Sequence, residues 1–353
     1  MPVNTKRVFY VKYLADPVFA EMLAQRPDVR LDRLENDAPD EAAVPVLAAA
    51  HVYQVGSARD EIARRFHVDA ALIARAPDLL IVSTNGVGYD TVDVKSCTDA
   101  GVLVLNQAGG NREAVAEHAV GMLLTLSKRI VETNLVMRKT HPIDRTAYMG
   151  NDVFGKTIGI IGLGHVGGRI SELCRGLFSM RVLAYDPYLT AAEIEARHAT
   201  KVSLEDLLRE SDYVSINCRL TAETRGMVGA AEFAMMRKGA YFISTARGHI
   251  HDEAALAEAL QNRAIAGAGL DVWATEPPPR EHPLLAFDNV LVSPHTAGVT
   301  RETRHNMGKI AAAQVLDAID GKPVKRIVNP EVWPAYARRF EHLMGFSPSA
   351  PGN

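Results

Sequence analysis

The stretch that most constrains the fold of this chain is KTIGIIGLGHVGGRI, residues 156–170, in which glycine recurs among aliphatic side chains. Gly162, Gly164 and Gly167 take the first, third and sixth positions of a GxGxxG pattern, between an apolar run and a helical pattern. A strand that turns sharply into a helix needs one glycine for the turn, one to leave the backbone bare beside a pyrophosphate and one for close packing. Phosphate binds where the first N–H groups of the helix converge. The pattern therefore predicts a dinucleotide site.

The next predicted strand, RVLAYD, ends on Asp186, at the distance along the chain that this kind of site requires. A carboxylate at that point accepts hydrogen bonds from the hydroxyl groups of an adenine ribose. The same negative charge repels a 2′-phosphate. The predicted cofactor is therefore NAD rather than NADP.

Predicted strands and helices alternate along most of the chain, which is typical of parallel sheets covered by helices. The runs RVFYVKYL, HVYQV, DLLIVST and VLVLNQ alternate with helical patterns between residues 7 and 106. One long helix is predicted over roughly 111–139. The alternation then restarts with TIGIIGLG, RVLAYD, YVSINC, GAYFISTA, AIAGAGLDV and VLVSPH, which fits a doubly wound dinucleotide fold. A further helix at 301–319 is expected to pack on the first domain, and the end of the chain, FSPSAPGN, is expected to fray.

Composition argues against several other classes of protein. Lys and Arg number 39 and Asp and Glu number 42, so no basic field favours nucleic acid as a partner. The apolar run from Ala119 meets Lys128 and Arg129 before it could span a bilayer, and the first residues do not resemble a secretion signal. The 3 cysteines form no CxxC pair, so neither a disulfide framework nor a metal site is expected. We expect a cytoplasmic protein.

Polar side chains that could take part in chemistry follow three later predicted strands. Arg247 follows GAYFISTA, Asp271 follows AIAGAGL with Glu276 shortly beyond, and His295 follows VLVSP. Doubly wound sheets bind ligands at the carboxyl ends of their strands. An arginine, carboxylates and a histidine gathered there would suit a small oxo acid.

These motifs together resemble those of the D-isomer-specific 2-hydroxyacid dehydrogenase family. The resemblance runs from about Asp78 to Pro330 and covers NGVGYDTVD, NREAVAEHAVGMLL, GIIGLGHVGGRI, STARG, AGAGLDVWATEP and SPHTAG, in that order. It implies an α/β fold of two doubly wound parallel-sheet domains, with a Rossmann NAD-binding domain inserted into a flavodoxin-like substrate domain. Residues 1–103 and 303–353 would form the substrate domain, and residues 104–302 the NAD-binding domain.

The resemblance implies a catalytic set of Arg247, Glu276 and His295. His295 would give a proton to the carbonyl oxygen during reduction and take it back during oxidation, a usual role for an imidazole near neutral pH. Glu276 would raise the pKa of His295. The planar guanidinium of Arg247 would hold the substrate carboxylate, and Asp271 would face the nicotinamide. His118 is expected to pack against a neighbour rather than to catalyse.

Further contacts follow from the same resemblance. Besides Arg247 and His295, the loop STNGVGYD would receive the substrate on bare backbone, through Asn85, Gly86, Val87 and Gly88, although a plain strand-to-helix turn explains its glycines equally well. The implied cofactor contacts beyond the glycines and Asp186 are His165, Val166, Cys218, Arg219, Thr224, Thr245, Ala246, Asp271 and Val115. Asn217 and Arg219 depart from the histidine and proline common in the family, which leaves open how tightly the cofactor binds.

The expected activity is that of an oxidoreductase, which transfers a hydride between NAD(H) and a small D-2-hydroxy acid or 2-oxo acid, as in glyoxylate/hydroxypyruvate reductases or phosphoglycerate dehydrogenases. Formate is disfavoured because Glu276 stands where formate-oxidising relatives have glutamine. Phosphite is disfavoured because Val87 stands where phosphite-oxidising relatives have lysine. The alternative is an NAD(H)-sensing regulatory binding protein of the corepressor type.

The family is typically dimeric, so a homodimer is expected. The long helix after Asn106 and the segment from His141 to Asn151 would cross to the second copy. The sequence leaves open which 2-hydroxy acid is the substrate and in which direction the reaction runs.

Overall fold

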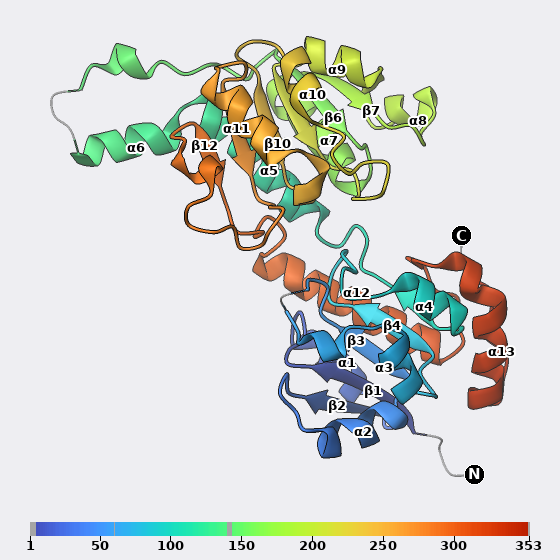
Figure 1. Ribbon diagram of the computed structural model, residues 1–353. Helices are drawn as coiled ribbons and strands as arrows, with labels where there is room; N and C mark the ends of the chain where they lie inside the picture. Colours follow the sequence, from blue (N-terminus) through green and yellow to red (C-terminus); the bar gives the residue numbers. More distant parts are fainter. Residues whose placement is uncertain (1–4, 60, 140–142, 352–353) are drawn as a thin grey trace. The chain divides into compact units, whose positions relative to one another are not determined.

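The computed structural model describes residues 5–59, 61–139 and 143–351. The chain divides into two compact units, one formed by Met1–Asn111 with Arg301–Asn353 and the other by Arg112–Thr300 (Figure 1). The first crossing comes later than residue 103, because β5, Leu103–Leu105, pairs with β4 in the sheet of the first unit. The second unit is thus inserted into the chain of the first.

The first unit contains a five-stranded sheet in the order β2-β1-β3-β4-β5, and all its pairings are parallel. This is the flavodoxin-like order, as predicted. Its strands are β1 Lys6–Val11, β2 Val29–Leu34, β3 Val52–Val55, β4 Ile81–Thr84 and β5. The strand β2, VRLDRL, was not predicted, because an edge strand keeps charged residues where an inner strand would be apolar.

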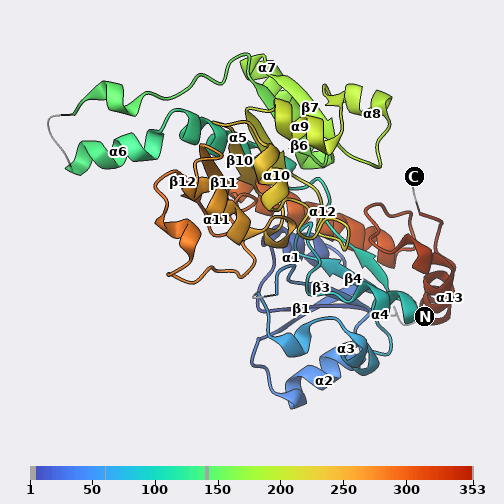
Figure 2. The ribbon, with the colours of Figure 1, turned by 45° about the horizontal axis from the view of Figure 1, so that its top comes forward.

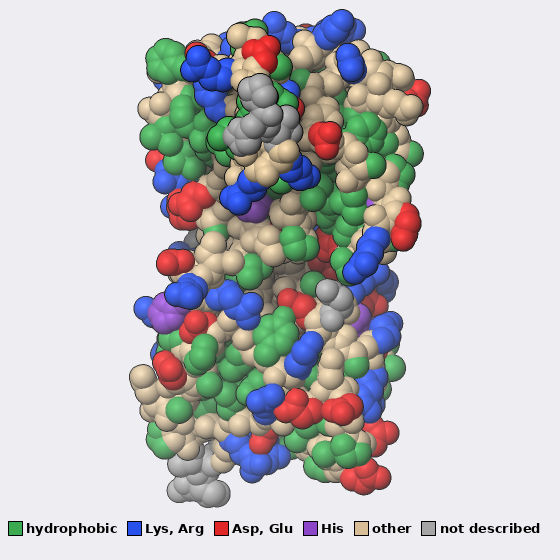
Figure 3. All heavy atoms as spheres, turned by 90° about the vertical axis from the view of Figure 1, so that its left-hand side faces the viewer, with side chains coloured by type: hydrophobic (Ala, Val, Ile, Leu, Met, Phe, Trp, Pro, Cys, Tyr) green, Lys and Arg blue, Asp and Glu red, His purple; other side chains and the backbone are tan. Residues whose placement is uncertain are grey.

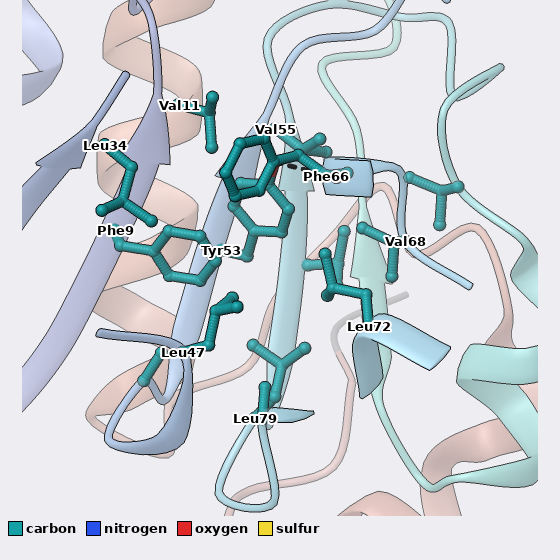
Figure 4. Packing of buried hydrophobic residues seen from close by; sticks show 14 of the residues in the cluster. Phe9, Val11, Leu34, Leu47, Tyr53, Val55, Phe66, Val68, Leu72 and Leu79 are labelled. Atoms are coloured by element: carbon teal, nitrogen blue, oxygen red, sulfur yellow. Dashed lines mark hydrogen bonds between the residues drawn. The ribbon is translucent and has the colours of Figure 1, made fainter. Parts of the chain in front are cut away.

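Helices cover both faces of the first sheet. On one face lie α1 Val18–Ala24, α12 Arg301–Ile319 and α13 Trp333–Met344. On the other lie α2 Asp40–Ala48, α3 Ala70–Arg75 and α4 Val94–Asp99. In this second core the rings of Phe9 and Tyr53 stack with centroids 4.1 Å apart, and the hydroxyl of Tyr53 donates to the carbonyl of Phe66 (Figure 4). Tyr53 is therefore a core residue.

The end of the chain does not fray as expected over its described part. Phe346 packs edge-on against Phe340 of α13, with ring centroids 5.2 Å apart. The N–H of Ser349 donates to the carbonyl of Gly321 at 2.7 Å. The aromatic contact and this hydrogen bond attach the tail to the first unit.

The second unit contains a seven-stranded parallel sheet in the order β12-β11-β10-β9-β6-β7-β8. Its strands are β6 Thr157–Ile161, β7 Arg181–Tyr185, β8 Thr200–Lys201, β9 Tyr213–Ile216, β10 Tyr241–Ser244, β11 Gly267–Leu270 and β12 Val290–Val292. The order reverses between β6 and β9, which is the doubly wound dinucleotide topology with its switch point. The six predicted strands are present. β8 was missed because it is two exposed residues long.

Helices also cover both faces of this sheet. On one face lie α5 Arg112–Ser127 and α7 His165–Phe178. On the other lie α9 Leu204–Glu210, α10 Ala230–Met235 and α11 Glu253–Gln261, and the short α8 Ala191–Glu195 follows β7. Two 3₁₀ turns, Gly248–Ile250 and Pro283–Ala286, lie on the connections that follow β10 and β11. These connections carry the polar residues of interest.

The prediction of one long helix over 111–139 is wrong. The chain forms α5 and then α6, Ile130–Lys139, with Arg129 between them in the left-handed region at φ 53°. The carbonyl of Ser127 accepts the N–H of Asn151 at 2.7 Å, and such a contact is invisible to local periodicity. In Figures 1 and 2, α6 projects from the body of the second unit. Residues 141 and 142, at the start of the segment expected to cross to a second copy, lie outside the described residues.

Candidate active site

The glycine-rich turn between β6 and α7 has a separate steric reason for each glycine of the pattern. Gly162 has φ 88°, and a Cβ there would lie 2.7 Å from the backbone nitrogen of Cys218. A Cβ on Gly167 would lie 2.2 Å from the carbonyl oxygen of Gly162. At Gly164, by contrast, no described atom beyond the adjacent residues lies within 4 Å of the Cβ position. The turn is thus closely packed at its first and last glycine and open at the middle one, which fits a pyrophosphate against bare backbone.

The N-terminus of α7 fits an anionic ligand. Gly164 is the N-cap and has no side chain to satisfy the first N–H groups of the helix, which begins with His165 and Val166. His165 is exposed and Val166 is half-buried. The N–H groups of this turn and the positive end of the helix dipole together favour a phosphate.

Asp186 lies beside the glycine-rich turn. Its Oδ2 accepts the N–H of Leu163 at 3.0 Å and its Oδ1 accepts the N–H of Tyr188 at 3.1 Å. The guanidinium of Arg197 donates to the carbonyl of the same Leu163. The peptide groups on either side of Leu163 are therefore both held, and the carboxylate of Asp186 lies beside the glycine-rich turn.

The loops after β9 and β10 supply the next predicted contacts. Burial raises the pKa of the Cys218 thiol to about 11, so the thiol stays protonated next to Gly162. Thr224 donates its hydroxyl to the carbonyl of the exposed Arg219 at 2.6 Å, which makes it a loop-holding residue. Thr245 is 8% exposed, and within the described chain its hydroxyl has no partner. Such an orphaned hydroxyl at a strand end suits a bound polar ligand.

Two further predicted cofactor contacts are apolar. Val115 is buried on α5, which packs against β10 and β11. Ala246 is half-buried, and its carbonyl accepts a hydrogen bond from the guanidinium of Arg247 at 2.7 Å. Both residues can contribute a wall to a site but no polar contact from the side chain.

His295 and Glu276 form a close pair. Nδ1 of His295 lies 2.7 Å from Oε2 of Glu276, and their side chains are 35% and 29% exposed. The hydrogen bond to Glu276 raises the pKa of His295, although burial and the charge of Arg247 oppose this. Burial by itself raises the pKa of Glu276, but the hydrogen bond and charge of His295 outweigh it, so that its pKa is lowered. The pair favours an imidazolium beside a carboxylate, with Nε2 as the ring nitrogen not engaged by Glu276.

Arg247 belongs to the same group of side chains. Its positive charge helps to lower the pKa of Glu276 and opposes the rise in the pKa of His295. The next residue, Gly248, is buried, and a Cβ there would lie 2.0 Å from the carbonyl carbon of Trp273. The loop after β10 is therefore pressed against the turn that leads to Glu276. Arg247, Glu276 and His295 come together within the second unit.

Asp271 holds the loop of His295, a task that the sequence did not reveal. Its side chain is fully buried, and its oxygens accept the hydroxyl of Ser293 at 2.6 Å and the N–H groups of Thr296 and Ala297 at 2.8 and 2.9 Å. The N–H of His295, a residue with φ 55°, donates to the carbonyl of Asp271 at 2.7 Å. These bonds hold His295 in a backbone conformation that few residues other than glycine adopt. The expected contact of Asp271 with the nicotinamide stays a prediction.

His118 makes a specific contact in place of simple packing. Its Nε2 lies 3.0 Å from the hydroxyl oxygen of Ser293, and that hydroxyl donates its hydrogen to the carboxylate of Asp271. His118 must therefore donate through Nε2. Ser293 and Trp273 were missed as site residues, although both lie inside the motifs SPHTAG and AGAGLDVWATEP; His118 lies in a third, NREAVAEHAVGMLL.

The loop that contains Asn85, Gly86, Val87 and Gly88 belongs to the first unit and follows β4. The carboxamide of Asn85 is already engaged, since it accepts from Gln54 at 2.9 Å and donates to the carbonyl of Tyr13 at 3.3 Å. The carbonyls of Gly86 and Val87 accept side-chain hydrogen bonds at 2.7 and 2.9 Å. In the described ranges the N–H groups of residues 86–88 have no hydrogen-bond acceptor. The backbone thus presents N–H groups suited to an anion.

The second unit defines a class of protein. It has a glycine-rich turn at the switch point of a parallel sheet, a carboxylate after the second strand, and a histidine–glutamate pair where later strands end. This is a dinucleotide-binding α/β domain equipped for proton transfer. Residues 120–297 match the family model of the D-isomer specific 2-hydroxyacid dehydrogenase, NAD binding domain. The chain belongs to this family, its second unit contains an NAD-binding domain, and the predicted family, fold class and cofactor are confirmed.

Similar proteins include curated enzymes and solved structures. A D-3-phosphoglycerate dehydrogenase of Archaeoglobus fulgidus is 39% identical over 79% of this chain and 52% of its own length. A glyoxylate reductase of Aeropyrum pernix is 40% identical over 75% of this chain and 81% of its own length. The chain thus spans about half the length of the phosphoglycerate dehydrogenase. A D-lactate dehydrogenase from Aquifex aeolicus, solved with NAD and lactic acid, matches with a TM-score of 0.76 at 26% identity, covering 89% of this chain and 96% of that structure.

These relatives are dehydrogenases and reductases, and they give no support to the corepressor-type alternative. Among the described helices, none combines the length and apolar character needed to cross a bilayer.

Proposed function

We propose that this chain is an NAD-dependent oxidoreductase that interconverts a small D-2-hydroxy acid and its 2-oxo acid. The observation that carries the proposal is the 2.7 Å contact between His295 and Glu276 in the unit that contains the NAD-binding domain. Arg247 completes the set, because its positive charge affects the pKa of both His295 and Glu276. A proton donor and a carboxylate-binding cation are the two groups that reduction of a 2-oxo acid requires from a protein.

In the proposed mechanism, a bound nicotinamide supplies the hydride for reduction and receives it in oxidation. His295 donates a proton from Nε2 to the carbonyl oxygen of the oxo acid as negative charge develops there. Glu276 stabilises the imidazolium before transfer and orients the ring through Nδ1. In the opposite direction, neutral His295 accepts the proton of the hydroxyl group.

Arg247 would bind the substrate carboxylate through its planar guanidinium. We also propose the N–H groups of Gly86, Val87 and Gly88 as substrate contacts, with Asn85 shaping the loop rather than binding through its engaged carboxamide. The proposal for these amides is supported by the carbonyl groups of the same loop, which already accept hydrogen bonds from side chains of the protein.

The residues proposed to hold NAD are those of the glycine-rich turn, the first turn of α7, Asp186 and the loops after β9 and β10. Gly164 leaves space for the pyrophosphate, and Asp186 would accept the ribose hydroxyl groups. Thr245 would give its hydroxyl a partner in the bound state. In this reading His165 and Val166 offer their backbone N–H groups, while Val115, Cys218, Arg219, Thr224, Ala246 and Asp271 line or support the site.

The test is the loss of NADH absorbance with purified protein across a panel of 2-oxo acids of increasing size and charge. We expect turnover with a small member such as glyoxylate or hydroxypyruvate, weaker use of NADPH, and a His295→Ala variant that is nearly inactive but binds NADH as the wild type does. Tight NADH binding without turnover on any acid would contradict the proposal.

We further propose a homodimer that uses α6. Four apolar residues of this helix are 44–57% exposed, namely Ile130, Val131, Leu135 and Met137. Figure 3 looks onto the face from which α6 projects and shows hydrophobic side chains among Lys and Arg there. Exposed apolar side chains gathered on one helix mark an association surface. The free thiols of the three cysteines fit the cytoplasm, which we propose as the location.

The dimer proposal is tested by sedimentation at micromolar concentration. The wild type should sediment as a dimer and the double variant Ile130→Asp, Leu135→Asp as a monomer. Val44→Asp, which changes an apolar residue 48% exposed in the first unit, should leave the mass unchanged. A monomeric wild type would contradict the proposal.

A further inference from the structure

A second histidine–carboxylate pair lies in the second unit, apart from His295 and Glu276. Nε2 of His282 lies 3.1 Å from Oε2 of Glu253, and both side chains are 15% exposed. The N–H of Leu284 donates to Nδ1 of His282 at 3.3 Å. Nδ1 is therefore the accepting nitrogen, and the ring hydrogen on Nε2 is donated to the carboxylate.

The other oxygen of Glu253 reaches the turn that leads to Glu276. Oε1 of Glu253 accepts the N–H of Ala274 at 2.7 Å. The ring of His282 packs edge-on against the indole of Trp273, with centroids 5.4 Å apart and planes at 78°. The Glu253–His282 pair thus holds this turn by two contacts, one with the backbone of Ala274 and one with the side chain of Trp273.

Trp273 transmits this position to both members of the acid–base pair. Its backbone N–H donates to Oε1 of Glu276 at 3.1 Å, which leaves Oε2 of that carboxylate for His295. Its indole N–H donates to the carbonyl of Ser293 at 3.1 Å, two residues before His295. A shift of Trp273 would therefore turn the carboxylate and move the histidine loop together.

Capping of α11 does not explain Glu253. The N-cap is Asp252, whose carboxylate accepts the N–H groups of Ala254 and Ala255 at 2.9 and 3.0 Å. Both oxygens of Glu253 point instead to partners outside the helix, Ala274 and His282. A largely buried carboxylate is costly unless it is hydrogen-bonded, so its two contacts are the reason it is tolerated there.

We propose that Glu253 and His282 are positioning residues, which hold the turn at Trp273 and Ala274 so that Glu276 faces Nδ1 of His295. They touch neither substrate nor cofactor, and they act through Trp273. The charged groups that act on His295 are Glu276, Arg247 and Asp271, and Glu276 is the one whose carboxylate accepts a hydrogen bond from this turn. The link to catalysis rests on the proposed function, whereas the link to the titration of His295 does not.

The test is an NMR titration of the His295 ring, assigned by its absence in His295→Gln. The variant Glu276→Gln gives the titration midpoint of a His295 ring that lacks its carboxylate partner. Glu253→Gln keeps the volume of the side chain but cannot accept at both oxygens, and His282→Phe keeps a ring against Trp273 without an N–H. We expect both variants to move the midpoint at least halfway from the wild-type value toward that of Glu276→Gln. Arg237→Ala, which breaks a surface pair with Asp212 just before β9, should leave the midpoint unchanged.

Turnover and stability separate the remaining explanations. We expect kcat/KM for a 2-oxo acid to fall about tenfold in both variants, with the Kd for NADH unchanged, because the glycine-rich turn is untouched. A wild-type midpoint in both variants would overturn the proposal, even if their melting temperatures fell. If one of the two variants does not fold, the titration midpoint of the other tests the proposal. Absence of turnover in the wild type would contradict the dehydrogenase activity, and the titration would still decide the positioning role.

Discussion

Gly248 lies so close to Trp273 that a Cβ at position 248 would stand 2.0 Å from the carbonyl carbon of Trp273 and 2.1 Å from its oxygen. The residue before Gly248 is Arg247, and Trp273 donates its N–H to Glu276. Two strand-end loops that carry charged residues of the site are therefore in direct backbone contact.

Gly248→Ala should lower both stability and activity, because backbone atoms on both sides must move to admit the methyl group. We expect a loss of at least about 2 kcal/mol in the free energy of unfolding, in the range of overpacked buried sites. Gly176→Ala is the control, since no described atom other than the nearby backbone of its own helix lies within 4 Å of its Cβ position, and alanine favours a helix. Urea unfolding of the two variants checks the expectation, and equal stabilities would refute it.

Gly164→Ala should weaken cofactor binding without weakening the fold. A methyl group there meets no described atom beyond the adjacent residues within 4 Å but would occupy space proposed for the pyrophosphate. Gly167→Ala should instead destabilise the protein, because its Cβ would lie 2.2 Å from a carbonyl oxygen. The measurements are the Kd for NADH by calorimetry and the melting temperature. An unchanged Kd in Gly164→Ala would count against the proposed pyrophosphate position.

Glu276→Gln should change the pH dependence of turnover. Reduction needs protonated His295, so kcat/KM for the oxo acid falls as pH rises through the pKa of His295, which Glu276 raises above its ordinary value. Without the carboxylate this fall should move to lower pH, and kcat/KM near neutral pH should drop by about 10²-fold, the low end for acid–base groups. A pH profile with the same midpoint as the wild type would show that Glu276 does not set the pKa of His295.

Asp186→Ala should reduce the preference for NADH over NADPH. Removing the carboxylate removes both the proposed acceptor for the ribose hydroxyls and the charge that repels a 2′-phosphate. We expect NADH to bind about tenfold more weakly, equivalent to about 1.4 kcal/mol, with a smaller loss for NADPH. Leu163→Ala, which leaves the backbone bonds of that residue in place, should keep the preference for NADH. An Asp186→Ala variant with an unaltered preference for NADH would refute the assignment.

Asp320→Asn should destabilise the first unit at neutral pH and much less in acid. Asp320 lies 2.9 Å from both Lys6 and Arg26, and Arg26 also pairs with Asp28. Hydrogen bonds from Arg26 lower the pKa of Asp320, and they lower that of Asp28 to about 2 from an ordinary 3.8. A depressed pKa means that this stabilisation is complete above about pH 4 and is lost as pH falls through the folded-state value.

We therefore expect the difference in unfolding free energy between wild type and Asp320→Asn to be about 1 to 3 kcal/mol at pH 7, and to shrink below pH 4. Urea titrations at pH 7, 4 and 3 measure it. A difference that is independent of pH would show that the ion pairs do not stabilise this unit.

Sequence spacing by itself determined the features that depend on neighbours along the chain. The glycines of residues 162–167, the apolar strand before them and Asp186 after the next strand lie within about thirty residues, so their pattern is local. The same holds for Arg247, Glu276 and His295, each of which follows a strong strand signal. Parallel strands place their carboxyl ends at one edge, and this is why residues far apart in sequence could be grouped correctly in advance.

Only the tertiary structure decided which atoms those residues meet. The end of α5 depends on an N–H from Asn151, and β2 is a strand because β1 pairs with it despite its charged residues. The carboxylate of Asp271 holds the loop of His295, a contact that its place at a strand end did not reveal, and Glu253 finds Ala274 and His282 across more than twenty residues. Hydrogen bonds of this kind are set by distance and angle in space, which periodicity along the chain does not encode.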